Sequence, residues 1–251
     1  MSIIENSSTF AKTNLILLFM AFILDRTDDR ARMPKKRIIA TAIIWYFIFL
    51  LINFAIIVGV TIIYNKMGVE PDQLTKFAGD RSLHMDSPLW YIAQLLLVAP
   101  VVEEIIFRLE LSFKRQTVAL WAGLLPVSIA GYLLDCSENW MLMAGMLLTG
   151  GVLYWLVMRY TTDEQWTQWR SRYLHTAIWL SALAFCFMHL RFTVLTWGLL
   201  PYCLAIILRP GLVGCILTYV RVNLGYWWGV LFHAANKAPA AIMMLFALYG
   251  Q

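Results

Sequence analysis

The sequence predicts an all-α protein, a polytopic bundle of about eight membrane-spanning helices. Of its 251 residues, 61% are hydrophobic and only 14% are charged, against roughly 25% charged residues in a soluble domain. Mean hydropathy is +0.68, and the apolar residues form runs close to the length of about 20 residues that a spanning helix needs. The net charge is +5, with basic residues clustered between apolar runs. Such clusters are typical of cytoplasmic loops, not of a nucleic-acid surface.

Eight apolar runs account for the predicted spans. They cover residues 38–64, 88–107, 117–134, 141–158, 174–190, 193–208, 211–220 and 226–249. An earlier run, residues 15–24, has no small-residue cleavage site before Asp25. We interpret it as a retained anchor or an interfacial helix and not as a cleaved signal peptide. Whether it spans the bilayer is left open by the sequence.

The connections between these runs predict an orientation. The basic segments 26–37, 108–115 and 159–172 are expected on the cytoplasmic side, and segments 65–87 and 135–139 on the opposite side. Residues 161–173 carry two tryptophans among polar residues, which suits a helix lying at the membrane interface. No repeat, low-complexity tract or linker divides the chain. One integral membrane domain over residues 1–251 is the simplest prediction.

The strongest chemical signal is a pair of adjacent glutamates inside an apolar run. Glu104 and Arg108 are four residues apart, so they share a helical face and can form an ion pair. Glu103 projects about 100° away and is expected to face a cavity as a proton-accepting base. The alternative is that these charges lie at a cytoplasmic helix end and meet lipid headgroups. Acids within the membrane usually face protein or water, which favours a functional site.

Two histidine segments add to this signal. Phe185 and His189 are four apart, so the phenyl ring can support the imidazole. His233 and Asn236 lie on neighbouring parts of one helical face and could both donate hydrogen bonds to a developing oxyanion. Taken singly, His189 could be a headgroup contact, and the His233–Asn236 pair could be a polar clamp between helices.

Together the three segments resemble the CAAX prenyl protease and bacteriocin-processing family, also called CPBP or Abi. Its EExxxR motif is matched by Glu103, Glu104 and Arg108, and its FxxxH motif by Phe185 and His189. Its third motif, a late histidine followed by asparagine, is similar to the segment that contains His233. The resemblance covers the chain from about residue 95 to the C-terminus, with the motifs in the family's order.

The resemblance implies an intramembrane endopeptidase with a catalytic core at about 88–251. Glu103 would activate water, His189 would help to position it, and His233 with Asn236 would stabilise the oxyanion. Glu104 and Arg108, with Phe185, would support the site. The resemblance favours a glutamate mechanism without a metal cofactor. The residue types alone leave zinc open, because two histidines and a carboxylate are a plausible ligand set.

Three departures from the family pattern stand out. The family places its asparagine four residues after the histidine, whereas that position here is Lys237 and the asparagine is Asn236. Lys237 could instead neutralise Glu103 and give an inactive relative. Leu109 stands where the family commonly has glycine. The 85 positions from Glu104 to His189 are longer than usual, so residues 117–160 are interpreted as an inserted pair of helices.

The sequence thus predicts a protease that cleaves a peptide or membrane-associated protein in or near the lipid bilayer, with no nucleic-acid partner. A non-catalytic scaffold or immunity protein of the same architecture is the alternative. A transporter is the weakest reading because inverted repeats are not visible. A bacterial inner membrane is the expected location, by the bacteriocin branch of the resemblance.

Overall fold

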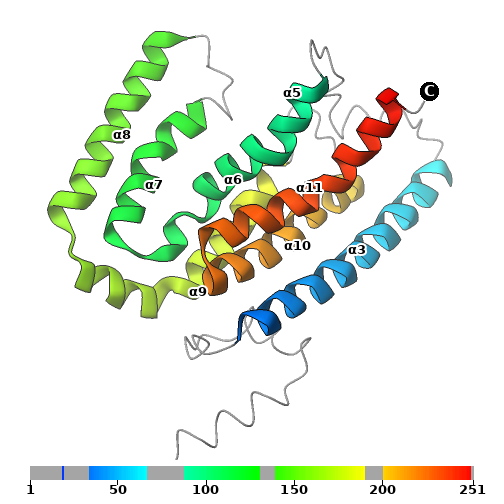
Figure 1. Cartoon of the computed structure of the whole chain (residues 1–251), viewed down its shortest axis with the longest axis horizontal. Helices are drawn as coiled ribbons and strands as arrows, with labels where there is room; N and C mark the ends of the chain where they lie inside the picture. Colours follow the sequence, from blue (N-terminus) through cyan, green and yellow to red (C-terminus); the bar gives the residue numbers. More distant parts are fainter. Residues whose placement is uncertain (1–18, 20–33, 67–87, 131–138, 190–199, 250–251) are drawn as a thin grey trace, which may run out of the picture. The chain divides into compact units, whose positions relative to one another are not determined.

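The computed structural model describes residues 19, 34–66, 88–130, 139–189 and 200–249. This part of the chain is helical and contains no strand, so the predicted all-α class is confirmed for it (Figure 1). The elements are α3 (Lys35–Lys66), α5 (Pro88–Ala93), the π-helix η1 (Gln94–Val98), α6 (Ala99–Arg108), the 3-10 turn η2 (Glu110–Ser112), α7 (Arg115–Ser128), α8 (Trp140–Tyr160), α9 (Asp163–Phe187), α10 (Leu200–Leu224) and α11 (Tyr226–Tyr249).

Four described helices are long and apolar enough to cross a membrane. They are Lys35–Lys66, Leu89–Arg108, Trp140–Tyr160 and Tyr226–Phe246. Each coincides with a predicted span. Their outward side chains are largely apolar, as on Leu51 and Phe54 of α3 and Leu148 of α8. These observations support a membrane protein, while the total of about eight spans stays a prediction.

Two expected helix boundaries do not occur. Predicted spans 193–208 and 211–220 fall within one helix, α10, which continues through Pro210; residues 193–199 lie outside the described part. A proline removes one backbone donor, and within a membrane neighbouring groups can satisfy the carbonyl it leaves behind. Similarly, the interfacial segment 161–173 and the span 174–190 share one helix, α9. Helix α7 covers residues 115–128 of the predicted span 117–134, and residues 131–134 lie outside the described part.

The contacts group the helices into two compact units. Unit 1 contains α3, α10 and the end of α9 from Trp179. Within it, α3 lies along α10, and Phe19 joins an aromatic cluster with Trp45, Phe49 and Tyr219, at ring-centroid distances of 4.8, 5.8 and 5.5 Å. The single-domain assignment for 1–251 and the core at 88–251 stay predictions.

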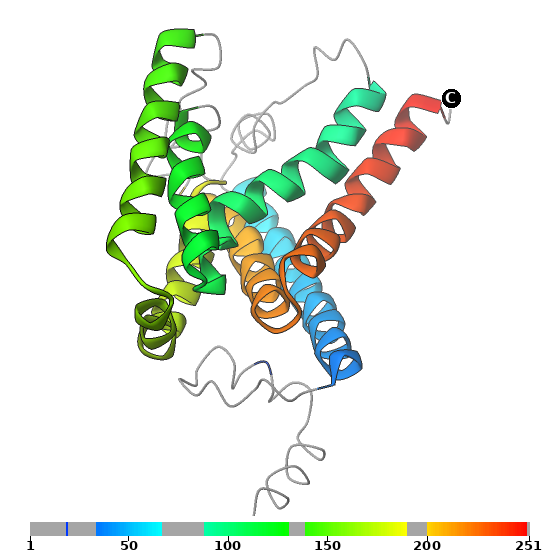
Figure 2. The same ribbon diagram turned by 60° about the vertical axis from the view of Figure 1, so that its left-hand side comes forward.

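Unit 2 contains α5 to α8, the first part of α9 up to Ile178, and α11. Helices α7 and α8 lie side by side (Figure 2). They come close together at two glycines: a Cβ added to Gly150 would lie 2.0 Å from the carbonyl oxygen of Gly123. Only residues without a side chain allow backbones to come this close. Helix α11 packs against η1 and α6, and this contact forms the candidate site.

Candidate active site

A π-helical turn precedes the two glutamates. The N–H of Ala99 donates to the carbonyl of Gln94, five residues earlier. Pro100 follows, and it has no N–H and would press its ring against the carbonyl four residues before it. The wider turn relieves that conflict and rotates everything after it relative to α5. Such π turns occur frequently at functional sites, and here the turn sets which way α6 presents Glu103 and Glu104.

Glu104 and Arg108 form the predicted ion pair. Arg108 Nη1 donates to Glu104 Oε1 at 2.5 Å, and neither side chain has exposed surface. Both come from α6, one turn apart, so this pairing follows from the helical period alone. A buried charge is stable only when it is paired and hydrogen-bonded. The ion pair with Arg108 therefore fixes the rotamer of Glu104 within the site.

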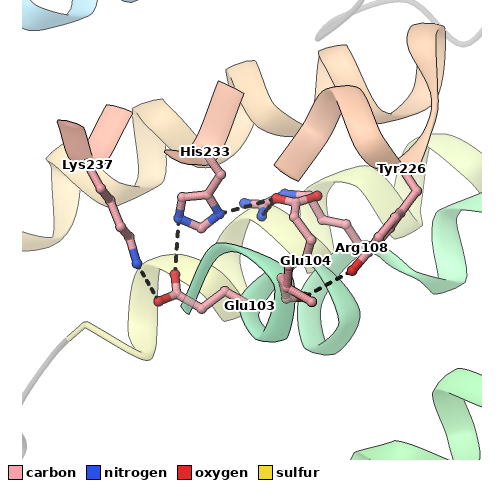
Figure 3. Close-up of polar contacts among 7 residues, drawn as sticks. Glu103, Glu104, Arg108, Tyr226, His233 and Lys237 are labelled. Atoms are coloured by element: carbon pink, nitrogen blue, oxygen red, sulfur yellow. Dashed lines mark hydrogen bonds and ion pairs between the residues drawn. The ribbon is translucent and has the colours of Figure 1, made fainter. Parts of the chain in front are cut away.

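His233 lies between the two glutamates (Figure 3). Its Nε2 is 3.2 Å from Glu103 Oε2, and its Nδ1 is 3.4 Å from Glu104 Oε1. The imidazole is 1% exposed. A neutral imidazole can donate through one ring nitrogen only, whereas the doubly protonated ring donates through both. A ring held between two carboxylates is therefore placed to carry a proton between them.

Lys237 completes the cluster and changes the environment expected for Glu103. Its Nζ donates to Glu103 Oε1 at 2.6 Å, while the other oxygen of Glu103 faces His233. The prediction that Glu103 is free to face a cavity is therefore wrong, and the alternative contact with Lys237 occurs: Glu103 is 3% exposed and held from two sides. The reason is the helical period of α11, which puts Lys237 one turn beyond His233 on the same face.

The cluster is nearly balanced in charge. Two carboxylates, Glu103 and Glu104, face two cations, Arg108 and Lys237, with His233 between them. Lys237 is the most exposed of the five, at 16% against 4% or less for the others. Lys237 is therefore the member of the cluster with the largest exposed fraction.

Two aromatic side chains anchor α6 on either side of the glutamates. The Tyr226 hydroxyl donates to the carbonyl of Val101 at 3.1 Å (Figure 3), and the Trp121 indole donates to the carbonyl of Ile106 at 2.8 Å. Sequence reasoning missed both residues. The acceptors are backbone carbonyls, so no side-chain motif in the sequence predicts these hydrogen bonds.

The remaining predicted site residues are Asn236, Phe185 and His189. Asn236 is half-buried on α11, but the α11 contacts to Glu103 come from His233 and Lys237. The rings of Phe185 and His189 contact each other as expected, at 4.7 Å between centroids, and His189 Nδ1 lies 2.8 Å from the carbonyl of Phe185. These two residues belong to unit 1, so their role beside Glu103 stays a prediction.

Comparison of the chain with protein-family models, curated proteins and solved structures found no match. The resemblance to the CPBP family therefore rests on the three motifs alone. Among the described residues, no group of three or more His, Cys, Asp or Glu side chains is arranged to hold a metal ion.

Proposed function

We propose that this chain is an intramembrane endopeptidase in which Glu103 activates water to hydrolyse a peptide bond. The observation that carries the proposal is a buried pair of adjacent carboxylates, contacted by one imidazole, inside a helix apolar enough to cross a membrane. Ionisable groups in hydrocarbon cost about 2.5 kcal/mol or more each. Apolar residues would pack the same helices at no such cost, so a chemical use is the better explanation.

The contacts support a division of roles within the cluster. The Glu104–Arg108 pair holds its position in α6, and His233 can pass a proton between the two carboxylates. The proposal assigns proton abstraction to Glu103. Oxyanion stabilisation falls to His233 and Asn236, and water positioning to His189, as the family resemblance implies. The substrate would be a peptide or a membrane-associated protein. The enzyme would be a bundle of about eight spans in a bacterial inner membrane.

Water can reach Glu103 only after one of its present contacts opens. His233 is held between two carboxylates and is almost fully buried. Lys237 is more exposed and sits on a flexible four-carbon stem. Lys237 is therefore the group that withdraws when substrate binds in this proposal.

The test is the isosteric substitution Glu103→Gln in the purified full chain reconstituted in lipid vesicles. Cleavage of a library of soluble and membrane-anchored peptides should fall at least about 100-fold, since a positioned base contributes roughly 10²–10⁴-fold. The control is Glu110→Gln, two residues beyond Arg108 and outside the motif, which should keep its activity. Wild-type rates in Glu103→Gln protein that remains folded would refute the proposal.

A second candidate, a non-catalytic membrane scaffold or immunity protein, is favoured by the Lys237–Glu103 contact. A base in contact with an ammonium group at 2.6 Å must lose that partner before it takes a proton. Lys237→Asn separates the candidates. For a peptidase, the substitution should raise cleavage and Glu103→Gln should abolish the gain. For a scaffold, neither the wild type nor Lys237→Asn cleaves any peptide.

The proposed mechanism needs no metal cofactor, with zinc as the alternative. Activity should therefore survive exhaustive treatment with a strong chelator, measured on the same peptides that report Glu103→Gln. Loss of activity that added zinc restores would overturn the metal-free mechanism. It would leave the assignment as a peptidase intact.

A further inference from the structure

Helix α8 has a groove on the face that α7 leaves uncovered. Helix α7 covers the side that carries Gly150 and Tyr154, both of which lie against Gly123. The groove lies elsewhere on the helix, has a volume of about 400 Å³, and is lined by Leu147, Leu148, Gly151, Val152 and Trp155. Gly151 forms the floor, since nothing lies within 4 Å of where its Cβ would be.

The groove continues into a stripe that ends in a cation. Leu148, Val152, Trp155 and Arg159 are spaced four, three and four residues apart, so they share one helical face. With a rise of 1.5 Å per residue the stripe is about 17 Å long. That is close to half of the hydrocarbon thickness of about 30 Å. The stripe therefore has the length of one leaflet, from the bilayer centre to the headgroups.

The order of side chains along the stripe matches the order of groups in a lipid. Leucine and valine come first, then Trp155, whose ring contacts that of Tyr160 at 6.0 Å, and finally the exposed Arg159. Tryptophan and tyrosine concentrate at the depth of the headgroups. This order is apolar, then amphipathic, then cationic, as an acyl chain and a phosphate require.

The cationic end is strengthened by the neighbouring loop. Arg115 donates to the carbonyl of Met158, which brings the start of α7, with the exposed Lys114, to the last turn of α8. Among the residues that the structure describes, no acidic side chain forms an ion pair with Lys114 or Arg159. Glu164, in the first turn of α9, is an acid near this end. Backbone hydrogen bonding lowers its pKa, and a hydrogen bond with Thr162 adds to this, so its carboxylate stays charged. In the two segments at this end, 109–115 and 159–172, cations outnumber acids: Lys114, Arg115, Arg159, Arg170 and Arg172 against Glu110, Asp163 and Glu164.

We propose that this groove is a binding site for an anionic phospholipid. One acyl chain lies over Gly151 between Leu148 and Trp155, and the phosphate lies against Arg159 and Lys114. The planar guanidinium of an arginine matches phosphate oxygens in a bidentate geometry. A lipid with net negative charge is attracted to the cations at this end of the helix. A zwitterionic lipid also brings its own headgroup cation, which these cations repel. The site is separate from the glutamate cluster and does not depend on the proposed peptidase activity.

The experiment measures thermal unfolding of the purified full chain in detergent, with added dioleoyl phosphatidylglycerol, dioleoyl phosphatidylcholine or inorganic phosphate. Phosphatidylglycerol should raise the unfolding temperature saturably, at a mole fraction about tenfold lower than phosphatidylcholine needs. Phosphate alone should have no effect. Arg159→Gln, which removes the cation, and Gly151→Leu, which fills the groove, should each weaken the response to phosphatidylglycerol about tenfold.

The controls make the same changes on another candidate span, α3. Lys66 is exposed in its last turn, and a Cβ on Gly59 would meet nothing within 4 Å. Lys66→Gln and Gly59→Leu should therefore respond to phosphatidylglycerol like the wild type. Equal responses to the two lipids would overturn the site, as would an unchanged response in Arg159→Gln. A full response to inorganic phosphate would show an anion site with no lipid groove. Should Gly151→Leu fail to fold, native mass spectrometry of lipids retained by Arg159→Gln and by the wild type gives the same decision.

Discussion

Among single residues, Lys237 does most to change the surroundings of Glu103. One turn of α11 separates it from His233, so the two side chains reach the two oxygens of the same carboxylate. The residue type was visible in the sequence as a departure from the asparagine of the family motif. The sequence also offered Glu103 as its possible partner, but only as an alternative, because Glu103 lies 134 positions earlier and spacing alone cannot bring the two together. The cluster thus places a flexible cation, and not a neutral amide, against the proposed base.

Breaking the Glu104–Arg108 pair should be costly. Arg108→Met leaves Glu104 fully buried without its cation, and removing one partner of a buried pair costs about 3–5 kcal/mol. The double substitution Glu104→Leu with Arg108→Met should recover most of that loss, since it removes both charges. Denaturant unfolding in detergent measures both variants. Arg172→Met, which removes an exposed arginine beside Tyr173, is the control and should change stability by less than about 1 kcal/mol. A double variant no more stable than the single one would contradict the pairing.

At the scale of elements, close glycine contact joins α7 to α8, and side-chain donors join α6 to its neighbours. The α7–α8 pair coincides with the predicted insertion at 117–160, and its two helices pack on each other through Gly123 and Gly150. In a hairpin of this kind, each helix buries much of its surface against the other helix of the pair. That property fits an inserted pair, and the insertion itself stays a prediction.

Gly150→Ala should separate these helices. The added Cβ would lie 2.0 Å from a backbone oxygen, which cannot rotate away, and overpacking of this kind typically costs about 1–3 kcal/mol. Gly145→Ala on the same helix meets nothing within 4 Å and should be neutral or slightly stabilising, because alanine favours a helix. Thermal unfolding of the two variants in the same detergent distinguishes them. Equal midpoints would mean that the glycine contact does not hold the pair together.

For the whole molecule, the apolar outer surfaces of α3 and α8 and the distribution of basic residues support insertion in a membrane. Helix α8 has 21 residues and so is about 31 Å long, enough to cross the hydrocarbon core. The orientation predicted from the loop charges therefore places its two ends on opposite sides of the bilayer, with the basic end expected in the cytoplasm.

Cysteine labelling tests that orientation. One variant keeps Cys136 as its sole cysteine, in the segment 135–139 before α8. The other carries Gln165→Cys in the first turn of α9, with the native cysteines changed to serine. In intact cells an impermeant maleimide should label the first variant only, and disrupted cells should expose the second. Labelling of both in intact cells would show that α8 does not cross the membrane.

Features that depend on local spacing could be predicted before the fold was known. Composition predicted the helical membrane class, and the 3.6-residue period paired Glu104 with Arg108 on α6 and Phe185 with His189 across the end of α9, because the members of each pair are four residues apart. The contacts between helices required the folded structure. They are Lys237 with Glu103, which the sequence offered as one alternative, Tyr226 with the carbonyl of Val101, and the glycine contact of α7 with α8. The folded structure also shows that α10 runs on through Pro210. Such outcomes depend on how distant segments pack and on which neighbours satisfy a backbone group, and no spacing within one segment encodes them.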